Sequence, residues 1–277
     1  MTIDSHQHFW SYNPAEYPWI TDRLSRIRRD YLPPDLEIEL SRLKLDGSIA
    51  VQARQSLEES RWLLTLADRH SSIRGVVGWV DLRSEQVADQ LSEFAKHPKF
   101  VGVRHVVQDE PDDQFMLRPD FLRGLGTLKG LNLTYDLLLY PKHLPAAIKV
   151  VEQLPQQLFV LDHIAKPLIN AGAISPWNDH IKDLAQFPNV YCKVSGLVTE
   201  ARWSEWEPED FRPFLDVVYE AFGEDRLMFG SDWPVCLLSG NYEQVVGIVH
   251  DYLSAFPESA YRKIMGENAA QVYRIGG

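Results

Sequence analysis

Short apolar runs rich in β-branched residues recur along the chain, and longer stretches with apolar residues three and four positions apart separate them. The short runs are typical of strands buried on both faces, and the longer stretches are typical of amphipathic helices. Eight runs are predicted to be strands, at residues 2–9, 48–53, 76–82, 100–107, 133–140, 158–164, 190–197 and 227–232.

The clearest predicted helices lie between these strands, at residues 57–69, 86–95, 210–222 and 242–256. Proline or glycine punctuates several of the joins between the elements. Strands that alternate with helices in this way predict an α/β protein built as a single (β/α)8 TIM barrel, and we expect residues 1–277 to form one domain.

A doubly wound sheet is the rival architecture, and it normally has a glycine-rich turn after its first strand. The first turn here has histidines instead, which favours the barrel. Gly124 and Gly126 follow a helical stretch, so we expect them to end that helix. The aromatic-rich segment 10–31 is a long first connection that could cover one end of the barrel.

The composition restricts the possible partners and the compartment. Hydrophobic residues make up 45% and charged residues 24% of the chain, and no apolar run is long enough for a membrane helix. The net charge of −11 argues against a nucleic-acid partner. Two distant cysteines and the absence of a leader-like start lead us to expect a cytoplasmic protein without a membrane partner. The oligomeric state does not follow from the sequence.

His6 and His8 are the first candidates for chemistry. Side chains two apart on a strand point the same way, so we expect Asp4, His6 and His8 to share one face. Catalytic groups of such barrels lie at the carboxyl ends of the strands, where this pair stands. Two imidazoles beside a carboxylate suit metal binding or hydrolysis.

The other strand ends supply further candidates. His163 and His105 stand late in the sixth and fourth predicted strands, and Asp232 ends the eighth, which closes against the first. Asp232 is therefore expected beside His6 and His8. The remaining histidines are expected to be solvated surface residues, namely His70, His97, His143, His180 and His250.

The chain resembles the amidohydrolase superfamily, specifically the sugar-lactonase branch that includes L-fuconolactone and L-rhamnonolactone hydrolases. The resemblance covers nearly the whole chain and rests on motifs that occur in a shared order. They are Asp4-Ser5-His6-Gln7-His8-Phe9-Trp10, Gly102-Val103-Arg104, Asp162-His163-Ile164-Ala165-Lys166-Pro167, Lys193-Val194-Ser195-Gly196-Leu197, Gly230-Ser231-Asp232-Trp233-Pro234 and Glu267-Asn268-Ala269-Ala270.

The resemblance implies hydrolysis of a cyclic ester, with Asp232 taking a proton from water. His163 and Lys193 are expected to stabilise the oxyanion that develops on the carbonyl. One divalent metal, Zn²⁺, has candidate ligands in His6, His8, His163 and Asp232. Binuclear relatives have a lysine in strand four and a histidine in strand five, whereas this chain has Arg104 and no histidine in 133–140. A binuclear centre is therefore not expected, and catalysis with one metal and without metal both stay open.

The expected ligand is a small sugar lactone such as L-fucono-, L-rhamnono- or galactonolactone. Its hydroxyls and ring need donors and aromatic platforms, for which the sequence offers Arg54, Arg104, His105, Tyr140 and Trp233. Two alternatives remain, a metal-dependent decarboxylase of the same fold and a non-catalytic carbohydrate-binding barrel. A serine hydrolase is disfavoured because the chain has no G-x-S-x-G motif.

Overall fold

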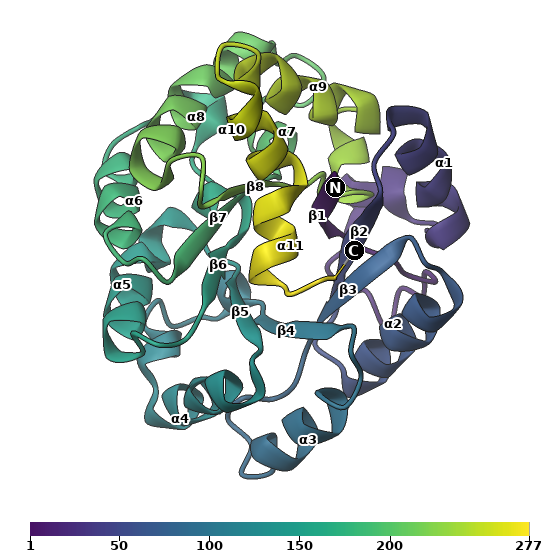
Figure 1. The fold of residues 1–277 in the computed structure, drawn as a ribbon, viewed down its shortest axis with the longest axis vertical. Helices are drawn as coiled ribbons and strands as arrows, with labels where there is room; N and C mark the ends of the chain where they lie inside the picture. The colour runs from purple at the N-terminus through teal and green to yellow at the C-terminus, as the bar shows by residue number, and fades with distance from the viewer. Residues whose placement is uncertain (277) are drawn as a thin grey trace.

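The computed structural model describes residues 1–276, in which eight parallel strands form a barrel surrounded by helices (Figure 1). The strands are β1 Ile3–Gln7, β2 Gly47–Val51, β3 Ile73–Gly78, β4 Phe100–His105, β5 Thr134–Leu137, β6 Phe159–Leu161, β7 Val190–Val194 and β8 Leu227–Phe229. The α-helices are α1 Pro33–Leu43, α2 Leu57–Arg69, α3 Val87–Phe94, α4 Pro119–Leu128, α5 Leu144–Gln153, α6 Trp177–Ala185, α7 Leu197–Glu200, α8 Pro208–Phe222, α9 Tyr242–Leu253, α10 Glu258–Arg262 and α11 Asn268–Val272.

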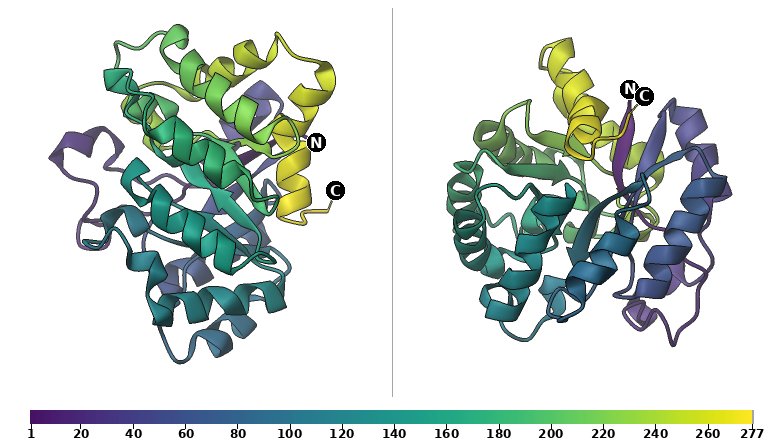
Figure 2. Two further views of the ribbon diagram at one scale, coloured as in Figure 1. Left: turned by 90° about the vertical axis from the view of Figure 1, so that its left-hand side faces the viewer. Right: turned by 60° about the horizontal axis from the view of Figure 1, so that its bottom comes forward.

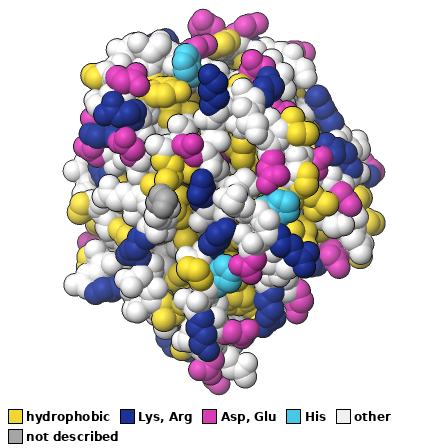
Figure 3. All heavy atoms as spheres, turned by 45° about the vertical axis from the view of Figure 1, so that its right-hand side comes forward, with side chains coloured by type: hydrophobic (Ala, Val, Ile, Leu, Met, Phe, Trp, Pro, Cys, Tyr) yellow, Lys and Arg dark blue, Asp and Glu magenta, His cyan; other side chains and the backbone are white. Residues whose placement is uncertain are grey.

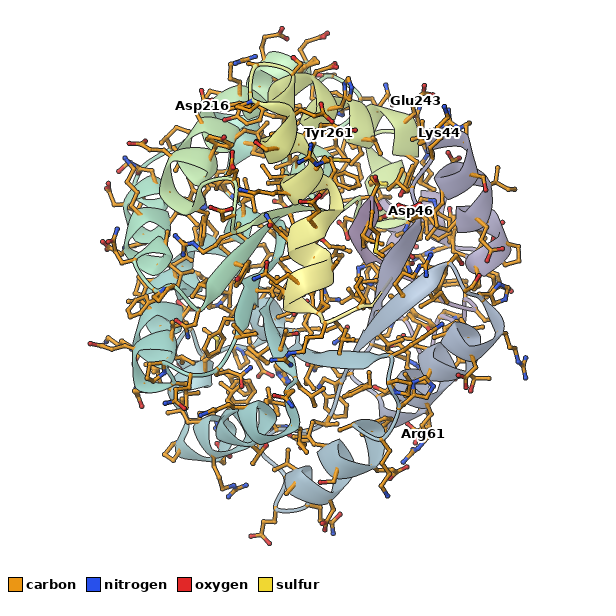
Figure 4. All side chains as sticks on the ribbon, viewed as in Figure 1. Lys44, Asp46, Arg61, Asp216, Glu243 and Tyr261 are labelled. Carbon is orange, nitrogen blue, oxygen red and sulfur yellow. The ribbon has the colours of Figure 1, made fainter. Side chains whose placement is uncertain are left out.

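The barrel closes where β1 meets the segment after β8. Each strand pairs in parallel with the next along the chain, and a bridge between Gln7 and Trp233 joins the two ends of the sheet. The backbone N–H of Asp232 donates to the carbonyl of His6 at 2.8 Å. On the outside of the barrel, Arg42 of α1 forms an ion pair with Glu243 of α9. Figure 4 shows Glu243 beside Lys44, the residue that follows α1. The predicted TIM barrel is confirmed.

Two strands end earlier than their apolar patterns predict. β6 stops at Leu161 and β8 stops at Phe229, so His163 and Asp232 lie in the loops that follow. Both residues have positive φ, 55° for His163 and 57° for Asp232, which a strand does not allow. Both segments are as buried as the strands before them, so burial does not mark where these strands end.

Asp4 does not share a face with the histidine pair, contrary to the prediction. The β1–β2 register shifts between Asp4 and Gln7, and such an irregularity breaks the two-residue alternation of side chains. The Asp4 carboxylate instead accepts hydrogen bonds from the Ser231 hydroxyl at 2.6 Å and from Tyr242 of α9 at 3.0 Å. Asp4 thus ties the barrel seam to the outer helix.

The Gly124–Gly126 pair does not end a helix, because both residues lie inside α4. A Cβ on Gly124 would come within 2.0 Å of the carbonyl oxygen of Leu82. Glycine is needed there so that the helix can pack directly against the backbone that follows β3. Gly124 in the sequence thus marks a close approach between α4 and the chain after β3, not the end of a helix.

Helix α11 lies across the amino-terminal end of the barrel, in front of the strands in Figure 1 and beside both termini in Figure 2. Its buried side chains Ala269 and Val272 belong to a small apolar cluster with strand residues such as Ile3 and Met228. Because α11 covers this end, the opposite end of the barrel is the one left for ligands.

The first connection, residues 10–31, packs as a structured cover rather than an extended loop. It contains the 3-10 helix Asp22–Ile27 and buries the rings of Trp10, Tyr17 and Tyr31. An ion pair of 2.8 Å between Glu16 and Arg54 joins it to the loop after β2. Acidic and basic side chains are interspersed on the face in Figure 3. Within residues 1–276, every helix is too short or too polar to span a bilayer.

Candidate functional site

Three side chains from the two ends of the sheet converge at the carboxyl end of the barrel. Nε2 of His6 lies 3.2 Å from Nε2 of His8, and Oδ1 of Asp232 lies 3.3 Å from His8 Nε2 and 3.8 Å from His6 Nε2. All three residues are buried. The site predicted around the histidine pair is therefore assembled, and Asp232 joins it across the barrel seam.

His163 completes the cluster from a left-handed turn. The residues from His163 through Lys166 all have φ between 47° and 60°, a run that non-glycine residues seldom adopt and that costs about 1–2 kcal/mol per residue. The turn brings His163 Nε2 to 3.9 Å from Asp232 Oδ1, while its Nδ1 lies 2.8 Å from the hydroxyl of Ser195. Gly196 leaves room for the ring, since a Cβ there would come within 2.7 Å of His163 Nδ1.

The tautomer of His8 follows from its backbone contact. Its Nδ1 lies 2.8 Å from the carbonyl oxygen of Val51, which can only accept, so Nδ1 must carry the proton and donate. In the neutral ring, Nε2 then presents a lone pair toward Asp232 and His6. Two electron-rich atoms that face each other in this way call for a cation or a proton donor between them.

A second layer of charge lies beneath the histidines. The Asp162 carboxylate is 3.3 Å from Nδ1 of His6, 3.0 Å from Arg104 Nη1 and 3.0 Å from Lys193 Nζ. Lys193 is also 2.6 Å from Asp136 of β5. The positive charges of Arg104 and Lys193 balance the negative charges of the Asp162 and Asp136 carboxylates. With neutral imidazoles, the cluster therefore retains the negative charge of Asp232.

The electrostatics keep the imidazoles of His6 and His163 neutral and Asp232 ionised. Burial lowers the pKa of His163 to about 4 and lowers the pKa of His6 well below its ordinary value. Burial alone would raise the pKa of Asp232, but the neighbouring imidazoles, His163 foremost, hold this pKa below its ordinary value. Burial is likewise outweighed at Asp162, whose pKa the Lys193 ammonium and its neighbours hold well below the usual range.

The spacing of the ligand atoms of His6, His8 and Asp232 fits one metal ion. Tetrahedral zinc with bonds of about 2.0–2.2 Å places neighbouring ligand atoms roughly 3.3–3.6 Å apart, close to the spacing of His6, His8 and Asp232. A second group, His6 with Asp162 and His163, is also compact. Its carboxylate is already bonded to Arg104 and Lys193, so two side-chain cations stand where a second metal would need to bind.

Two of the sequence-predicted residues take other places. His105 faces away from the cluster: its Nε2 lies 2.7 Å from Glu110 and its ring stacks on Phe115. Trp233 packs edge-on against Phe9 and Tyr31 and is buried, so its ring is not an open platform.

Three other predicted residues lie at different depths. Lys193 has no exposed surface and lies below His6, too deep to contact a ligand above the cluster. Arg54 and Tyr140 are at the rim, Arg54 paired with Glu16 and Tyr140 with Lys166 Nζ 5.6 Å from its ring.

Several residues of the site were missed in the sequence. Asp136 and Ser195 have no motif of their own, although strand alternation places Asp136 on the inner face opposite Arg104. Glu200, at the end of α7, is also close enough to influence Asp232 and Lys166, and burial raises its pKa. Among the histidines expected at the surface, His143 is fully buried rather than solvated, and its Nδ1 accepts the N–H of Tyr140.

A barrel that carries histidines at the end of β1 and after β6 and an aspartate after β8 is the architecture of a metal-assisted or acid–base hydrolase. The chain belongs to the amidohydrolase family, whose model matches residues 3–275. It is 40% identical to an L-fucono-1,5-lactonase of Burkholderia multivorans over 99% of this chain and 96% of that protein. An L-fucono-1,5-lactonase of Burkholderia ambifaria is 37% identical over 99% of this chain and 95% of that protein.

A solved structure shares the fold closely. The crystal structure of an amidohydrolase from Burkholderia multivorans with bound zinc superposes with a TM-score of 0.96 at 39% identity, and the match covers 100% of both chains. The buried histidine and aspartate cluster of this chain is thus a candidate metal site within a family that includes a zinc-bound member.

Proposed function

We propose that this protein hydrolyses a sugar lactone to the open-chain acid, with L-fucono-1,5-lactone as the first candidate substrate. The observation that carries the proposal is the ionised Asp232 carboxylate among three buried imidazoles at the open end of the barrel. The similarity to two L-fucono-1,5-lactonases over nearly the full chain supports the substrate class.

In the proposed reaction, Asp232 accepts a proton from a water molecule, and the water oxygen attacks the lactone carbonyl. The tetrahedral intermediate collapses with cleavage of the ring C–O bond, and the proton held by Asp232 passes to the leaving ring oxygen. The product acid then ionises and releases one proton to solvent.

His163 is the proposed donor to the oxyanion. Its low pKa keeps the ring neutral, and the Ser195 hydroxyl can donate to Nδ1 and so leave the proton on Nε2, the nitrogen that faces Asp232. One fixed donor of this kind is worth about 3–4 kcal/mol of transition-state stabilisation. Lys193 serves this step indirectly, because it lies beneath His6 rather than at the carbonyl.

We propose His6, His8 and Asp232 as the residues that hold one zinc ion, with His163 at the edge of the set. The donor spacing and the residual negative charge of the cluster support this assignment. Bound zinc would polarise the lactone carbonyl and lower the pKa of a coordinated water.

The rim supplies the proposed contacts to the sugar hydroxyls. These groups are Tyr140 with Lys166 and Arg54 with Glu16, on loops around the cluster, and Glu200 at the end of α7. Arg104 lies deeper, bonded to Asp162 and to the carbonyl of Gln52, and we propose it as a support for the cluster. A decarboxylase is less suitable, because the decarboxylases of this fold use a strand-five histidine as a metal ligand. The inward polar residue of β5 is instead Asp136, which is already bonded to Lys193.

A lactone panel tests the proposal. Purified protein is added to weakly buffered L-fucono-1,5-lactone, L-rhamnonolactone and D-galactonolactone, and acid release is followed by pH-stat. Faster opening of at least one lactone by the protein than by its Asp232→Asn variant is expected. Equal rates for the two proteins on every lactone would contradict the proposal.

A further inference from the structure

A line of buried polar groups connects the C-terminal helix to the histidine cluster. Tyr273 directly follows α11, and its hydroxyl donates to Oδ2 of Asp136 at 2.8 Å. Nζ of Lys193 donates to the same oxygen at 2.6 Å and lies 5.5 Å from the centre of the Tyr273 ring. The three side chains are buried in the interior of the barrel, between α11 and the site.

Lys193 links Asp136 to the histidine cluster. Its ammonium is 3.0 Å from Oδ1 of Asp162 and 3.2 Å from Nδ1 of His6. Since Lys193 has no exposed surface, it cannot touch a substrate, and any effect on the reaction must pass through His6 and Asp162.

Stability alone is a weak reason for this network. A buried ion pair loses its hydration, and well-packed apolar residues of similar volume are often as stabilising or more so. Asp136 is nevertheless held by three donors, since the Thr134 hydroxyl lies 3.3 Å from its other oxygen. Such saturation fixes Asp136, and through it the ammonium of Lys193, in one place.

We propose that Tyr273 and Asp136 are positioning residues, which hold Lys193 so that the His6 ring keeps the tautomer that the site requires. Nη1 of Arg104, which can only donate, lies 3.2 Å from Nε2 of His6, so Nε2 accepts and the proton of the neutral ring is on Nδ1, 3.3 Å from Asp162. This inference rests on the proposed function, because it assigns residues that act through His6.

The loss of either residue changes the balance at His6 Nδ1, which has an acceptor and a donor within reach. When Asp136 no longer fixes the ammonium, Lys193 is free to donate to Nδ1, and the ring proton then resides on Nε2. The imidazole would point a hydrogen at the site instead of a lone pair. A wrong tautomer of this kind lowers turnover without changing the binding surface at the rim.

Tyr273→Phe is the test variant, and Tyr135→Phe is its matched control. Tyr135 is a fully buried tyrosine of β5 next to Asp136, and its hydroxyl has no hydrogen-bond partner among the described residues. Each variant loses one buried hydroxyl, but only Tyr273→Phe loses a contact to Asp136. We expect kcat on L-fucono-1,5-lactone to fall about tenfold in Tyr273→Phe with KM unchanged, and Tyr135→Phe to match the wild type.

A second readout does not depend on the substrate. In protein labelled with ¹⁵N-histidine, the His6 ring signals are identified by their loss in His6→Gln, and their shifts report the tautomer. We expect the fraction with Nε2 protonated to rise in Tyr273→Phe and to stay the same in Tyr135→Phe. If the wild-type protein opens no lactone, the proposed function fails, but this measurement still decides the positioning role.

Asp136→Asn adds a test of the order of action. Because Tyr273 acts through Asp136, the double variant should have the kcat of Asp136→Asn alone. Equal kcat and equal His6 signals in Tyr273→Phe and Tyr135→Phe would overturn the inference. A lower Tm for Tyr273→Phe with unchanged kcat would overturn it too, since that pattern indicates a purely structural hydroxyl. If Asp136→Asn fails to fold, the two tyrosine variants decide the matter.

Discussion

Oδ1 of Asp232 lies 3.3 Å from Nε2 of His8, although the two residues come from opposite ends of the chain. The contact crosses the seam at which β1 meets the segment after β8, where the backbone is joined by hydrogen bonds in both directions. Closure of the barrel and assembly of the site are therefore the same structural event.

Asp232→Asn should abolish most of the lactone hydrolysis. The amide keeps the shape of the side chain but cannot accept a proton from water, and such a loss typically lowers kcat by about 10²- to 10⁴-fold. Initial rates across a range of lactone concentrations, with circular dichroism to verify folding, provide the measurement. A variant with the wild-type kcat would remove Asp232 from the role of base.

Zinc binding should depend on His8 but not on His105. Both histidines are buried, yet only His8 directs a lone pair toward Asp232, whereas His105 is bonded to Glu110. Competition with a chromophoric chelator should show one zinc per chain in the wild type and in His105→Gln, and weakening of about 100-fold in His8→Gln. Equal zinc affinity of the two variants would place the metal elsewhere.

Gly196→Ala should impair activity more than Gly172→Ala. Both glycines have φ near +60°, so alanine costs about 1–2 kcal/mol of folding free energy at either position. Only at Gly196 would the new methyl group also collide with the His163 ring, whereas nothing lies within 4 Å at Gly172. Urea unfolding should thus reveal a loss of stability in both variants, and kinetics a drop in kcat at Gly196 alone. Similar kcat values would show that the ring can move without consequence.

The stability of the protein should decline between pH 4.5 and 7 in a way that depends on Glu59. Burial raises the pKa of Glu59 from 4.5 to about 7, so the folded state favours the protonated form. The free energy of unfolding contributed by this group is largest below pH 4.5 and falls by about 3 kcal/mol as the pH rises through 7.

The variant Glu59→Gln isolates the contribution of this carboxyl group to the free energy of unfolding. The amide oxygen can still accept the N–H groups of Ala53 and Arg54, which lie 3.0 Å from the carboxylate, but it cannot ionise. Unfolding curves at several pH values should therefore converge for the two proteins at low pH, with the variant more stable at pH 8. Parallel curves would mean that Glu59 does not titrate in this range.

Alanine should have opposite effects at the two glycines of α4. At Gly124 a methyl group would overlap the Leu82 carbonyl, whereas nothing lies within 4 Å of a Cβ at Gly126. We expect Gly126→Ala to raise the free energy of unfolding by about 0.5–1 kcal/mol and Gly124→Ala to lower it. A gain in stability at both positions would show that α4 can shift away from β3.

The strand pattern predicted the barrel because every strand is buried on both faces and stands out as an apolar run. The same burial concealed where strands end. Residues 162–165 after β6 are as buried as the strand itself, and their backbone, left-handed from His163 onward, marks the change. His163 was thus correctly located at the carboxyl end of the barrel, but its turn was not predictable from hydrophobicity.

The histidine and aspartate cluster at the carboxyl end of the barrel was predictable, and the polar groups beneath it were not. His6, His8 and Asp232 follow from strand order, since parallel strands bring their carboxyl ends together. Asp136 and Tyr273 act from inside and below the barrel, and a lone aspartate in a strand or a tyrosine after a helix carries no local signal. Their relationship depends on how α11 packs across the barrel, which only the three-dimensional structure specifies.

The place of Tyr273 has a consequence for biosynthesis. A nascent chain emerging from the ribosome makes β1 first, yet His6 and His8 gain Asp232 only after β8 is made, and Asp136 gains its tyrosine partner later still. The segment that ends at Tyr273 must leave the exit tunnel before the barrel interior is complete. Ribosome-bound chains in which β8 is still inside the exit tunnel lack Asp232 at the site and are therefore expected to be catalytically silent.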